Sequence, residues 1–389
     1  MSDMSEKKII KVCHMTSAHP RYDQRILYRE CVSLQKEGYH VTLIVNDEKE
    51  NEKFKNINIK STKHDYTVSR WKRMIFGTYH VYKLALKEDA DIYHFHDPEL
   101  LPFAIKLKKK NKVVIFDSHE NYYDRIQYKY YIPQHIRKIA AKLYSFYENR
   151  VLKKIDGVIF PTLINGKNIF EGRSNNVALV NNMPDLDEIP KDIDNKNINK
   201  EGICYAGGLT YDRGIFFLMQ AAYKAQVPLY LAGKFSSLSF KKEIMNGQES
   251  NFVYYKGILG RKEIYQLYNS CCIGMCTLLD KGQYSQSDNL PTKVYEYMAM
   301  GMPVILSDFL YNRQVIEKYK FGMLVDPEDP DDIAEKINYL MSHKEKAVQM
   351  GQNGKKLIYE KWNWKNEDKK LLGLYKSILN KNNLINNKK

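Results

Sequence analysis

The chain has 389 residues, 43% of them hydrophobic, and a formal net charge of +15. This length is sufficient for two domains with separate cores, and the positive charge favours an anionic partner such as a nucleotide, a nucleic acid or an acidic membrane surface. No basic segment with a following apolar run opens the chain, and its apolar runs are too short to span a bilayer. The six cysteines form no C-x-x-C pair, which favours reduced thiols, argues against zinc and predicts a cytoplasmic protein.

The chain begins with an alternation of strands and helices. We expect a strand at 8–14, then a helix that ends near Gly38, then a strand at 39–45, which is typical of a doubly wound parallel sheet. Ligands bind at the carboxyl ends of the strands in such sheets. The loop after the first strand therefore offers candidate residues for an acceptor, namely His19, Asp23 and Arg25. The alternative is a loop held together by its own Asp–Arg pairs.

Two further strands are each followed by a histidine. His96 comes after the strand expected at 91–94, and His119 after the strand expected at 113–116. Because the carboxyl ends of parallel strands meet at one edge of a sheet, both imidazoles are candidates for one site. Metal binding is less favoured, since two imidazoles with scattered carboxylates lack a compact ligand spacing.

Residues 122–154 alternate tyrosines with lysines and arginines, and helical periodicity begins after Pro133. One interpretation is an amphipathic helix lying on anionic lipid, which would make the protein peripheral on the inner face of the plasma membrane. The other is a helix that packs its tyrosines onto the sheet. Residues 67–89 form another expected helix with basic and aromatic character.

The second half repeats this organisation after a polar linker at 185–200. Strands are expected at 203–206, 228–232, 252–255 and 272–277, with helices between them. Gly207 and Gly208 follow the first of these strands as a tight turn that lacks the G-x-G-x-x-G dinucleotide fingerprint. The pair Asp185-x-Asp187 resembles a metal-binding motif but lies in the linker, where it is best explained as coincidence.

One stretch organises the second half: SQSDNLPTKVYEYMAMGMPVILSD, residues 285–308. Pro291 suits a first helical turn, Gly301 ends the helix, and a buried strand follows at 303–307. Asp288 and Glu296 then lie about 12 Å apart at the rise of an α-helix, which is too far for acid/base work on one bond. The spacing suits two acceptors at the ends of an extended ligand, with a helix N-terminus facing an anion between them.

This stretch resembles the E-x7-E signature of family 4 retaining glycosyltransferases, in the form N-x-P-x-K-x-x-E-Y-M-A-x-G-x-P-V. The resemblance implies that Asp288, in place of the usual Glu, faces the donor sugar and that Glu296 holds the ribose. The turn from Gly208 to Gly214 resembles the family's diphosphate turn G-R-L-x-x-x-K-G, with the first cation missing and Arg213 in place of Lys. The histidine segments described above resemble those that approach the anomeric carbon.

The resemblance covers nearly the whole chain and implies an α/β GT-B fold, with two Rossmann-like doubly wound domains facing across a cleft. Residues 1–184 would bind the acceptor and 201–364 the nucleotide-sugar. A helix at 365–380 would return to the first domain, and 381–389 would form a disordered tail. The implied donor-binding residues are Gly207, Gly208, Arg213, Asn289, Lys293 and Glu296, and the implied catalytic residues are His96, His119 and Asp288.

The implied reaction moves a sugar from a UDP- or GDP-linked donor to a saccharide or lipid-linked saccharide, with retention of configuration, in cell-surface polysaccharide assembly. Cationic side chains and helix N-termini would stabilise the diphosphate, so no metal and no other cofactor is expected. Two alternatives stay open: a sugar-nucleotide epimerase on the same scaffold, and a basic nucleic-acid-binding protein, although no nucleic-acid module is recognised.

Overall fold

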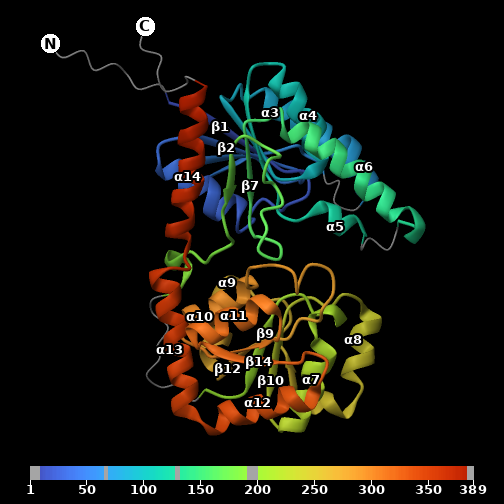
Figure 1. Ribbon diagram of the computed structural model, residues 1–389, viewed down its shortest axis with the longest axis vertical. Coiled ribbons are helices and arrows are strands. Elements are labelled where there is room, and N and C mark those ends of the chain that lie inside the picture. Colours follow the sequence, from blue (N-terminus) through green and yellow to red (C-terminus); the bar gives the residue numbers. More distant parts are fainter. Residues whose placement is uncertain (1–8, 65–68, 128–131, 191–199, 383–389) are drawn as a thin grey trace, which may run out of the picture. The chain divides into compact units, whose positions relative to one another are not determined.

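A computed structural model describes residues 9–64, 69–127, 132–190 and 200–382. The chain divides into two compact units (Figure 1). Unit 1 comprises Met1–Leu163, Lys167–Asn182 and Lys365–Lys389, and unit 2 comprises Ile164–Gly166 and Met183–Trp364. Most of the expected linker and the expected tail, at 191–199 and 383–389, lie outside the described residues.

Unit 1 is built on an eight-stranded sheet in the order β3-β4-β2-β1-β5-β6-β7-β8. All pairings are parallel except that of β3 with β4. The strands are β1 (Lys11–Met15), β2 (His40–Val45), β3 (Glu52–Phe54), β4 (Ile57–Ser61), β5 (Ile92–Phe95), β6 (Val113–Asp117), β7 (Gly157–Phe160) and β8 (Val177–Leu179). The edge hairpin β3–β4 was not predicted, because its three-residue first strand lacks an apolar run.

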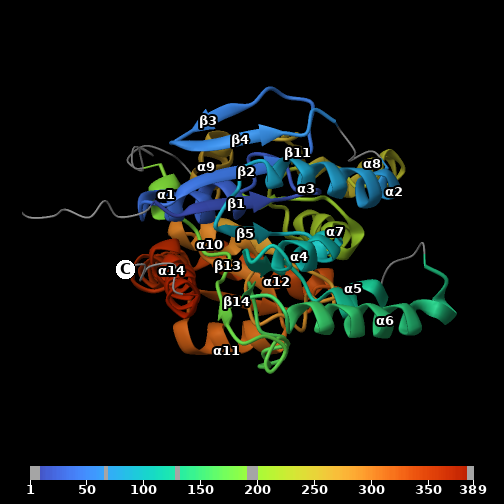
Figure 2. The same ribbon diagram turned by 90° about the horizontal axis from the view of Figure 1, so that it is seen from above.

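The helices of unit 1 lie on both faces of this sheet (Figure 2). They are α1 (Val32–Lys36), α2 (Arg70–Lys72), α3 (Thr78–Leu86), α4 (Leu101–Lys108), α5 (Tyr122–Gln127), α6 (Gln134–Leu152) and α14 (Trp364–Lys381). The single helix predicted at 67–89 is wrong in detail, because a π-helical segment at Arg73–Gly77 separates α2 from α3. A second π-helical segment, Ile26–Cys31, leads into α1.

Successive side chains of β1 and β5 point to opposite faces of the sheet, as in any strand. Cys13 and Tyr93 therefore join the hydrophobic core that α3, α4 and α6 cover. His14 and His94 point to the other face, where Tyr375 of α14 hydrogen-bonds to His94 Nδ1 over 2.8 Å. This alternation places imidazoles in a buried layer between the sheet and α14.

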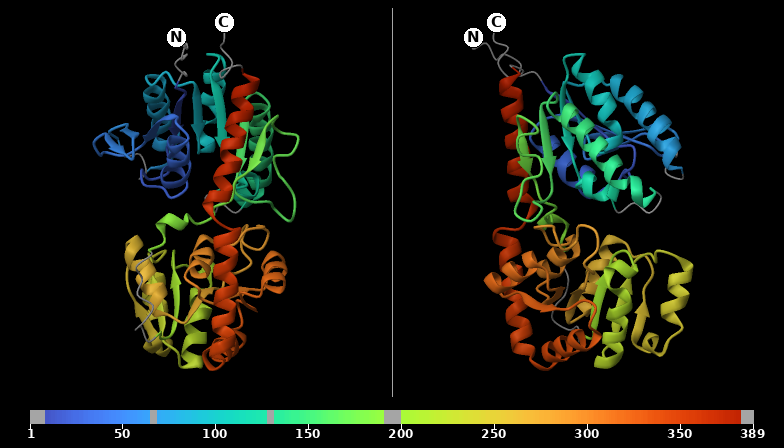
Figure 3. Two further views of the ribbon diagram at one scale, coloured as in Figure 1. Left: turned by 90° about the vertical axis from the view of Figure 1, so that its left-hand side faces the viewer. Right: turned by 45° about the vertical axis from the view of Figure 1, so that its right-hand side comes forward.

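Unit 2 is built on a six-stranded sheet in the order β11-β10-β9-β12-β13-β14, and all its pairings are parallel. The strands are β9 (Ile203–Ala206), β10 (Leu229–Ala232), β11 (Val253–Tyr255), β12 (Ile273–Cys276), β13 (Val304–Ser307) and β14 (Gly322–Val325). Helices cover both faces (Figure 3). They are α7 (Ile215–Ala225), α8 (Leu238–Met245), α9 (Arg261–Ser270), α10 (Thr292–Ala299), α11 (Leu310–Tyr319), α12 (Pro330–Ser342) and α13 (Lys344–Glu360).

Two parallel sheets, each with helices on both faces, confirm the predicted α/β class with two Rossmann-like units. Helix α10 is buried on every side, so Lys293 and Glu296 lie inside unit 2. No helix in the described part of the chain combines the length and the apolar character that crossing a bilayer requires.

Candidate functional site

Two cations of unit 2 converge on the turn after β9. Lys293 is 8% exposed, and its ammonium lies 3.5 Å from the centre of the Tyr205 ring. A Cβ atom built on Gly207 would meet Lys293 Nζ at 2.9 Å and Arg213 Nη1 at 3.5 Å. The bare backbone of Gly207 therefore leaves a small space that both cations border.

The ammonium of Lys293 has no hydrogen-bond partner among the described residues. Burial lowers the pKa of Lys293 to about 7, and the nearby guanidinium of Arg213 acts in the same direction. A buried cation beside a second, partly buried cation is unfavourable unless an anion is bound, because burial removes hydration and the two charges repel. The pair is therefore suited to bind an anionic group.

Gly214 fixes the position of Arg213. Its φ of +72° is left-handed, and a Cβ there would lie 1.8 Å from the carbonyl oxygen of Thr277. Only glycine fits this position, which connects the turn carrying Arg213 to the start of α7. The hydroxyl Oγ1 of Thr277 is also buried without a partner among the described residues.

The carboxylate of Glu296 is held from two sides. Arg261 Nη1 donates a hydrogen bond of 2.5 Å to Oε1, and the Tyr268 hydroxyl donates one of 3.1 Å to Oε2. Arg261 also donates to Glu188 over 2.9 Å. Arg261 thus bridges two carboxylates and fixes the orientation of Glu296 within α10.

Asp288 and Asn289 lie in the loop before α10. Asp288 Oδ2 accepts a 2.6 Å hydrogen bond from the backbone N–H of Gly166, and Asn289 Oδ1 accepts one from the Tyr295 hydroxyl. An antiparallel bridge between Ile164 and Ser287 ties the same two loops. Asp288 thus anchors the short segment 164–166, which belongs to unit 2 by its contacts.

In unit 1 the loop after β1 is organised by Asp97, which follows β5. Asp97 Oδ2 accepts hydrogen bonds of 2.7 Å from both the Thr16 hydroxyl and the Ser17 backbone. Asp97 Oδ1 lies 3.6 Å from His19 Nε2, and His19 Nδ1 lies 3.3 Å from an oxygen of Asp23. The two carboxylates therefore hold the His19 imidazole between them.

Asp117, at the end of β6, organises the other histidines. Its Oδ2 lies 3.3 Å from His96 Nδ1 and 3.1 Å from His119 Nε2. Arg25 donates two hydrogen bonds to the same carboxylate, of 2.7 and 2.9 Å. The rings of His119 and His19 lie 4.5 Å apart, so the network is continuous with the Asp97 loop.

Accessibility separates these side chains. His96 is fully buried, whereas the side chains of His19, Asp23 and His119 are 25%, 20% and 15% exposed. Burial lowers the pKa of His96 to about 4 against the pull of Asp117. For His19 burial acts the same way, but the hydrogen bond to Asp23 and the charge of Asp97 outweigh it and raise its pKa. His19 and His119 are exposed enough to contact a ligand directly, whereas the fully buried His96 can act only on their positions.

The structure brings the unit 1 candidates His19, Asp23, Arg25, His96 and His119 into one network. In unit 2 it places Gly207, Gly208, Arg213 and Lys293 together, with Glu296 further along α10 and Asp288 and Asn289 in the preceding loop. Sequence reasoning missed Asp97, Asp117 and Arg261. The two aspartates follow β5 and end β6, which was a usable signal, whereas nothing local marks Arg261.

The exposure and contacts of helix α6 bear on the two interpretations of residues 122–154. Ile136, Ile139, Leu143 and Phe146 follow helical spacing and are 41–66% exposed. Lys138 and Lys142 are exposed beside them. Tyr144 instead packs inward against the core, as the second interpretation expects for the tyrosines, while the lipid-facing interpretation stays a prediction. Residues 128–131, with Lys129, lie outside the described residues.

Both halves of the chain match glycosyltransferase families. Residues 24–187 match the model of Glycosyltransferase Family 4, and residues 188–357 match that of Glycosyl transferases group 1. An uncharacterized glycosyltransferase of Methanocaldococcus jannaschii is 22% identical over 335 residues, which cover 81% of this chain and 80% of that protein.

Other relatives match over shorter stretches. Spore coat protein SA of Bacillus subtilis is 29% identical over 132 residues, 34% of this chain and 33% of that protein. A second glycosyltransferase of M. jannaschii is 26% identical over 180 residues, 45% of this chain and 44% of that protein. The chain thus spans less than half the length of these two relatives.

Solved structures share the fold over the whole chain. Sucrose-phosphate synthase from Thermosynechococcus elongatus superimposes with a TM-score of 0.75 at 16% identity, covering 96% of this chain and all of that one. Anabaena HepE in complex with UDP-glucose gives a TM-score of 0.68 at 14% identity, covering 95% of this chain and all of that one. These likenesses show the GT-B fold, and the two family matches show that the chain is a transferase enzyme that belongs to the family 4 type of glycosyltransferases.

Proposed function

We propose that the chain moves a sugar from a nucleoside diphosphate sugar, UDP- or GDP-linked, to a saccharide or lipid-linked saccharide. The transfer retains the anomeric configuration and serves cell-surface polysaccharide assembly. The new bond joins an acceptor oxygen to the anomeric carbon, and the bond from that carbon to the diphosphate breaks. Epimerisation and nucleic-acid binding are less well supported, because both matched families are described as transferring glycosyl groups.

The observation that carries this proposal is the unpartnered ammonium of Lys293 beside Arg213. A diphosphate bound over Gly207 and Gly208 would give both cations an anionic partner. Negative charge grows on the leaving phosphate as its bond to the sugar breaks, so cations placed there lower the barrier to transfer. HepE, which shares the fold, was solved with UDP and with UDP-glucose, and this supports a nucleotide-sugar donor.

In this proposal Glu296 accepts hydrogen bonds from the ribose, and Arg261 and Tyr268 orient it. Asp288 and Asn289 approach the donor sugar from the loop before α10. His19, Asp23 and His119 form the accessible acceptor side of unit 1, and Arg25 and His96 position them through Asp117. The cations make a metal at the diphosphate unnecessary, and no other cofactor is proposed.

A lipid-linked acceptor would require access to a membrane, and α6 has a suitable surface. Four of its apolar residues are exposed next to Lys138 and Lys142, namely Ile136, Ile139, Leu143 and Phe146. Trp71, Met74, Ile75 and Phe76, in α2 and the following π-helical segment, are also exposed. Apolar side chains flanked by lysines bind the interface of anionic bilayers. We propose peripheral association of unit 1 with the inner face of the plasma membrane.

The test is a panel of nucleotides and nucleotide-sugars scored by thermal shift, with Lys293→Met as the site variant. Ligand binding stabilises the folded protein by an amount that grows with the logarithm of the ratio of ligand concentration to Kd, and this raises the melting temperature. We expect one UDP or GDP series to stabilise the wild type and to stabilise Lys293→Met less. The donor found in this way is then incubated with acceptors, and the anomeric configuration of the product is read by NMR. Equal stabilisation of both proteins contradicts the placement of the diphosphate.

A further inference from the structure

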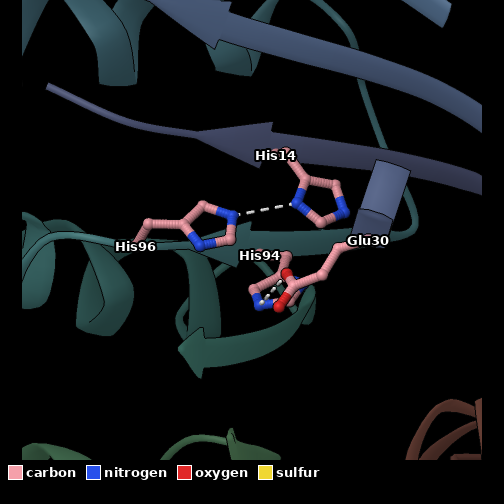
Figure 4. Close-up of side chains that lie close together, drawn as sticks. All are labelled: His14, Glu30, His94 and His96. Atoms are coloured by element: carbon pink, nitrogen blue, oxygen red, sulfur yellow. Dashed lines mark hydrogen bonds and ion pairs between the residues drawn. The ribbon is translucent and has the colours of Figure 1, made fainter. Parts of the chain in front are cut away.

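Four ligating side chains meet in the buried layer on the α14 face of the unit 1 sheet. They are His14 of β1, Glu30 of the π-helical segment Ile26–Cys31, His94 of β5, and His96 just after β5 (Figure 4). Each offers one ligand atom, the four atoms lie within 4.8 Å of one another, and all four side chains are 0% exposed. We propose that this His14–Glu30–His94–His96 cluster binds a divalent transition-metal ion, of which Zn²⁺ is the chemical type.

Several polar atoms of the cluster lack a partner. His14 Nε2, His94 Nε2 and Glu30 Oε2 have no hydrogen-bond partner among the described residues, whereas Glu30 Oε1 pairs with Arg25 Nε over 3.0 Å. Burying several polar atoms without partners in one place is costly, and most buried polar groups avoid it. A cation at their centre would supply the missing interactions, and imidazole nitrogens with a carboxylate oxygen form a recognised ligand set for zinc.

Two of the histidines are already oriented as metal ligands usually are. His94 Nδ1 hydrogen-bonds to the Tyr375 hydroxyl over 2.8 Å, and His96 Nδ1 lies 3.3 Å from Asp117. Partners on one ring nitrogen fix the ring and leave the other nitrogen to bind the metal, an arrangement that is common around zinc. His94 Nε2 therefore has no hydrogen-bond partner among the described residues, and His96 Nε2 faces His14 Nδ1 at 2.9 Å, a contact that the ion would replace.

The spacing fits a tetrahedral ion. Bonds of 2.0–2.1 Å imply ligand atoms about 3.3 Å apart. His14 Nδ1 and His96 Nε2 are 2.9 Å apart, and His94 Nε2 and Glu30 Oε2 are 3.8 Å apart, so these two observed separations lie on either side of that value. Small adjustments of the side chains would accommodate the ion.

Charge near the cluster is also compatible with a cation. Arg25 Nε lies 3.0 Å from Glu30 Oε1 and 2.7 Å from Asp117 Oδ2, so two buried carboxylates share this guanidinium. The other oxygen of Glu30 faces His94. Arg25 thus holds Glu30 in place as a ligand without occupying the oxygen that the ion would use.

The ion would be structural. The cluster is sealed from solvent and joins β1, β5, the helix after β1 and, through Tyr375, helix α14. A second group, His96–Asp117–His119, shares one histidine with it but reaches the surface through His119. The fully buried cluster is favoured because it supplies four donors to the ion. This inference does not rest on the proposed transfer reaction.

The first experiment measures bound metal by mass spectrometry in the full chain, purified with a tag free of histidine from cells supplied with zinc. We expect about one zinc per chain in the wild type and less than about a tenth of that in His94→Ala and Glu30→Gln. His119→Ala, the matched variant of the second group, should keep its zinc. Zinc retained by His94→Ala but lost from His119→Ala would overturn the assignment.

A second measurement covers the case in which the cluster variants fail to fold. Wild-type protein is unfolded with a chelator, refolded with Co²⁺ or without metal, and desalted. We expect about one Co²⁺ per chain, with the visible absorption bands of tetrahedral nitrogen and oxygen ligation, and a higher melting temperature than the metal-free sample. Refolding to the same melting temperature with no bound cobalt would refute the site.

Discussion

The two units gather charge at their strand ends in opposite ways. In unit 1, Asp117 is held by two hydrogen bonds from Arg25 and lies against two histidines. In unit 2, Lys293 is buried beside Arg213 with no hydrogen-bond partner among the described residues. Unit 1 compensates its charges within the protein, whereas unit 2 leaves a positive charge that an anion must compensate.

We infer from this difference that the two units have different roles in binding. A pre-compensated network is rigid and binds by shape and by a few accessible groups, here His19, Asp23 and His119. A pair of uncompensated cations binds by charge, and its affinity depends on the charge state of the pair. We therefore expect substitutions in unit 1 to change the rate of transfer and those in unit 2 to change nucleotide affinity.

The largest effect is expected for His119→Asn, which should lower kcat by about 100-fold or more, because a positioned imidazole contributes about 10²–10⁴ to a rate. Nucleotide affinity, measured by calorimetry, should stay unchanged. His40→Asn, which alters the exposed histidine at the start of β2, is the control and should retain wild-type kcat. If the His119 variant loses nucleotide affinity instead, the result contradicts the expectation that unit 1 affects the rate and unit 2 the nucleotide affinity.

Lys293→Met should weaken binding of the nucleoside diphosphate by about ten- to a hundredfold, since hydrogen bonds to charged groups contribute about 1.5–3 kcal/mol. Affinity for the uncharged nucleoside should not change. Lys224→Met, which removes an exposed lysine paired with Asp331 in the same unit, is the matched control. If the lysine variant binds the nucleoside diphosphate as well as the wild type does, the cation pair is not the anion site.

The pKa of Lys293 predicts a pH dependence. With a pKa of about 7 in the free protein, the protonated fraction of Lys293 falls from about a quarter at pH 7.5 to about 1% at pH 9, and diphosphate affinity should fall by about tenfold over this range. The phosphates are already ionised in this range, so their titration does not contribute. Lys293→Met should remove the dependence, and a wild-type profile that is flat in calorimetry would show that the ammonium does not contact the anion.

The same group affects folding. The folded chain binds fewer protons at Lys293 than the unfolded chain does between pH 7 and 10.5, so this residue makes the free energy of unfolding rise with pH across that window. Denaturant titrations of wild type and Lys293→Met without ligand test this point. The difference in free energy of unfolding between them should change with pH in that direction.

Charge at the surface of unit 1 gives a smaller effect. Each lysine near anionic lipid contributes about 1 kcal/mol, so Lys138→Glu with Lys142→Glu should reduce co-sedimentation with anionic vesicles at low salt several-fold. Neutral vesicles should not bind the wild type. A double variant in unit 2, Lys344→Glu with Lys356→Glu on α13, changes the net charge equally and should bind as the wild type does. An equal loss of vesicle binding in both double variants would show that net charge alone, and not the surface of α6, determines binding.

The smallest effect is expected from chelation. Brief treatment with EDTA, followed by transfer assays with and without added Mg²⁺ or Mn²⁺, should change activity less than about twofold, because the proposed diphosphate site uses Lys293 and Arg213. The proposed structural ion is sealed from solvent and should survive this treatment, which metal analysis after the assay verifies. Activity lost to EDTA and restored by Mg²⁺ would contradict the metal-free diphosphate site.

Much of the fold followed from local pattern. Strands β1, β2, β5, β6, β9, β10, β11, β12 and β13 were predicted within a few residues of their observed bounds, because buried strands between helices give continuous apolar runs. The hairpin β3–β4 and the π-helical break before α3 were missed, since neither leaves a periodic apolar signal. Motif spacing also selected Glu296 and Lys293 as candidates, and strand ends selected His96 and His119, and their roles stay predictions.

Tertiary structure decided how these residues act. His96 and His119 have the same sequence context, a loop after a strand, yet only the fold buries the first and leaves the second accessible. Arg261 and Tyr375 lie 35 and 281 residues from Glu296 and His94, the groups they orient, so no local pattern could pair them. Burial and long-range pairing set the pKa of Lys293 and gather His14, Glu30, His94 and His96, because desolvation and proximity depend on the packing of the whole unit.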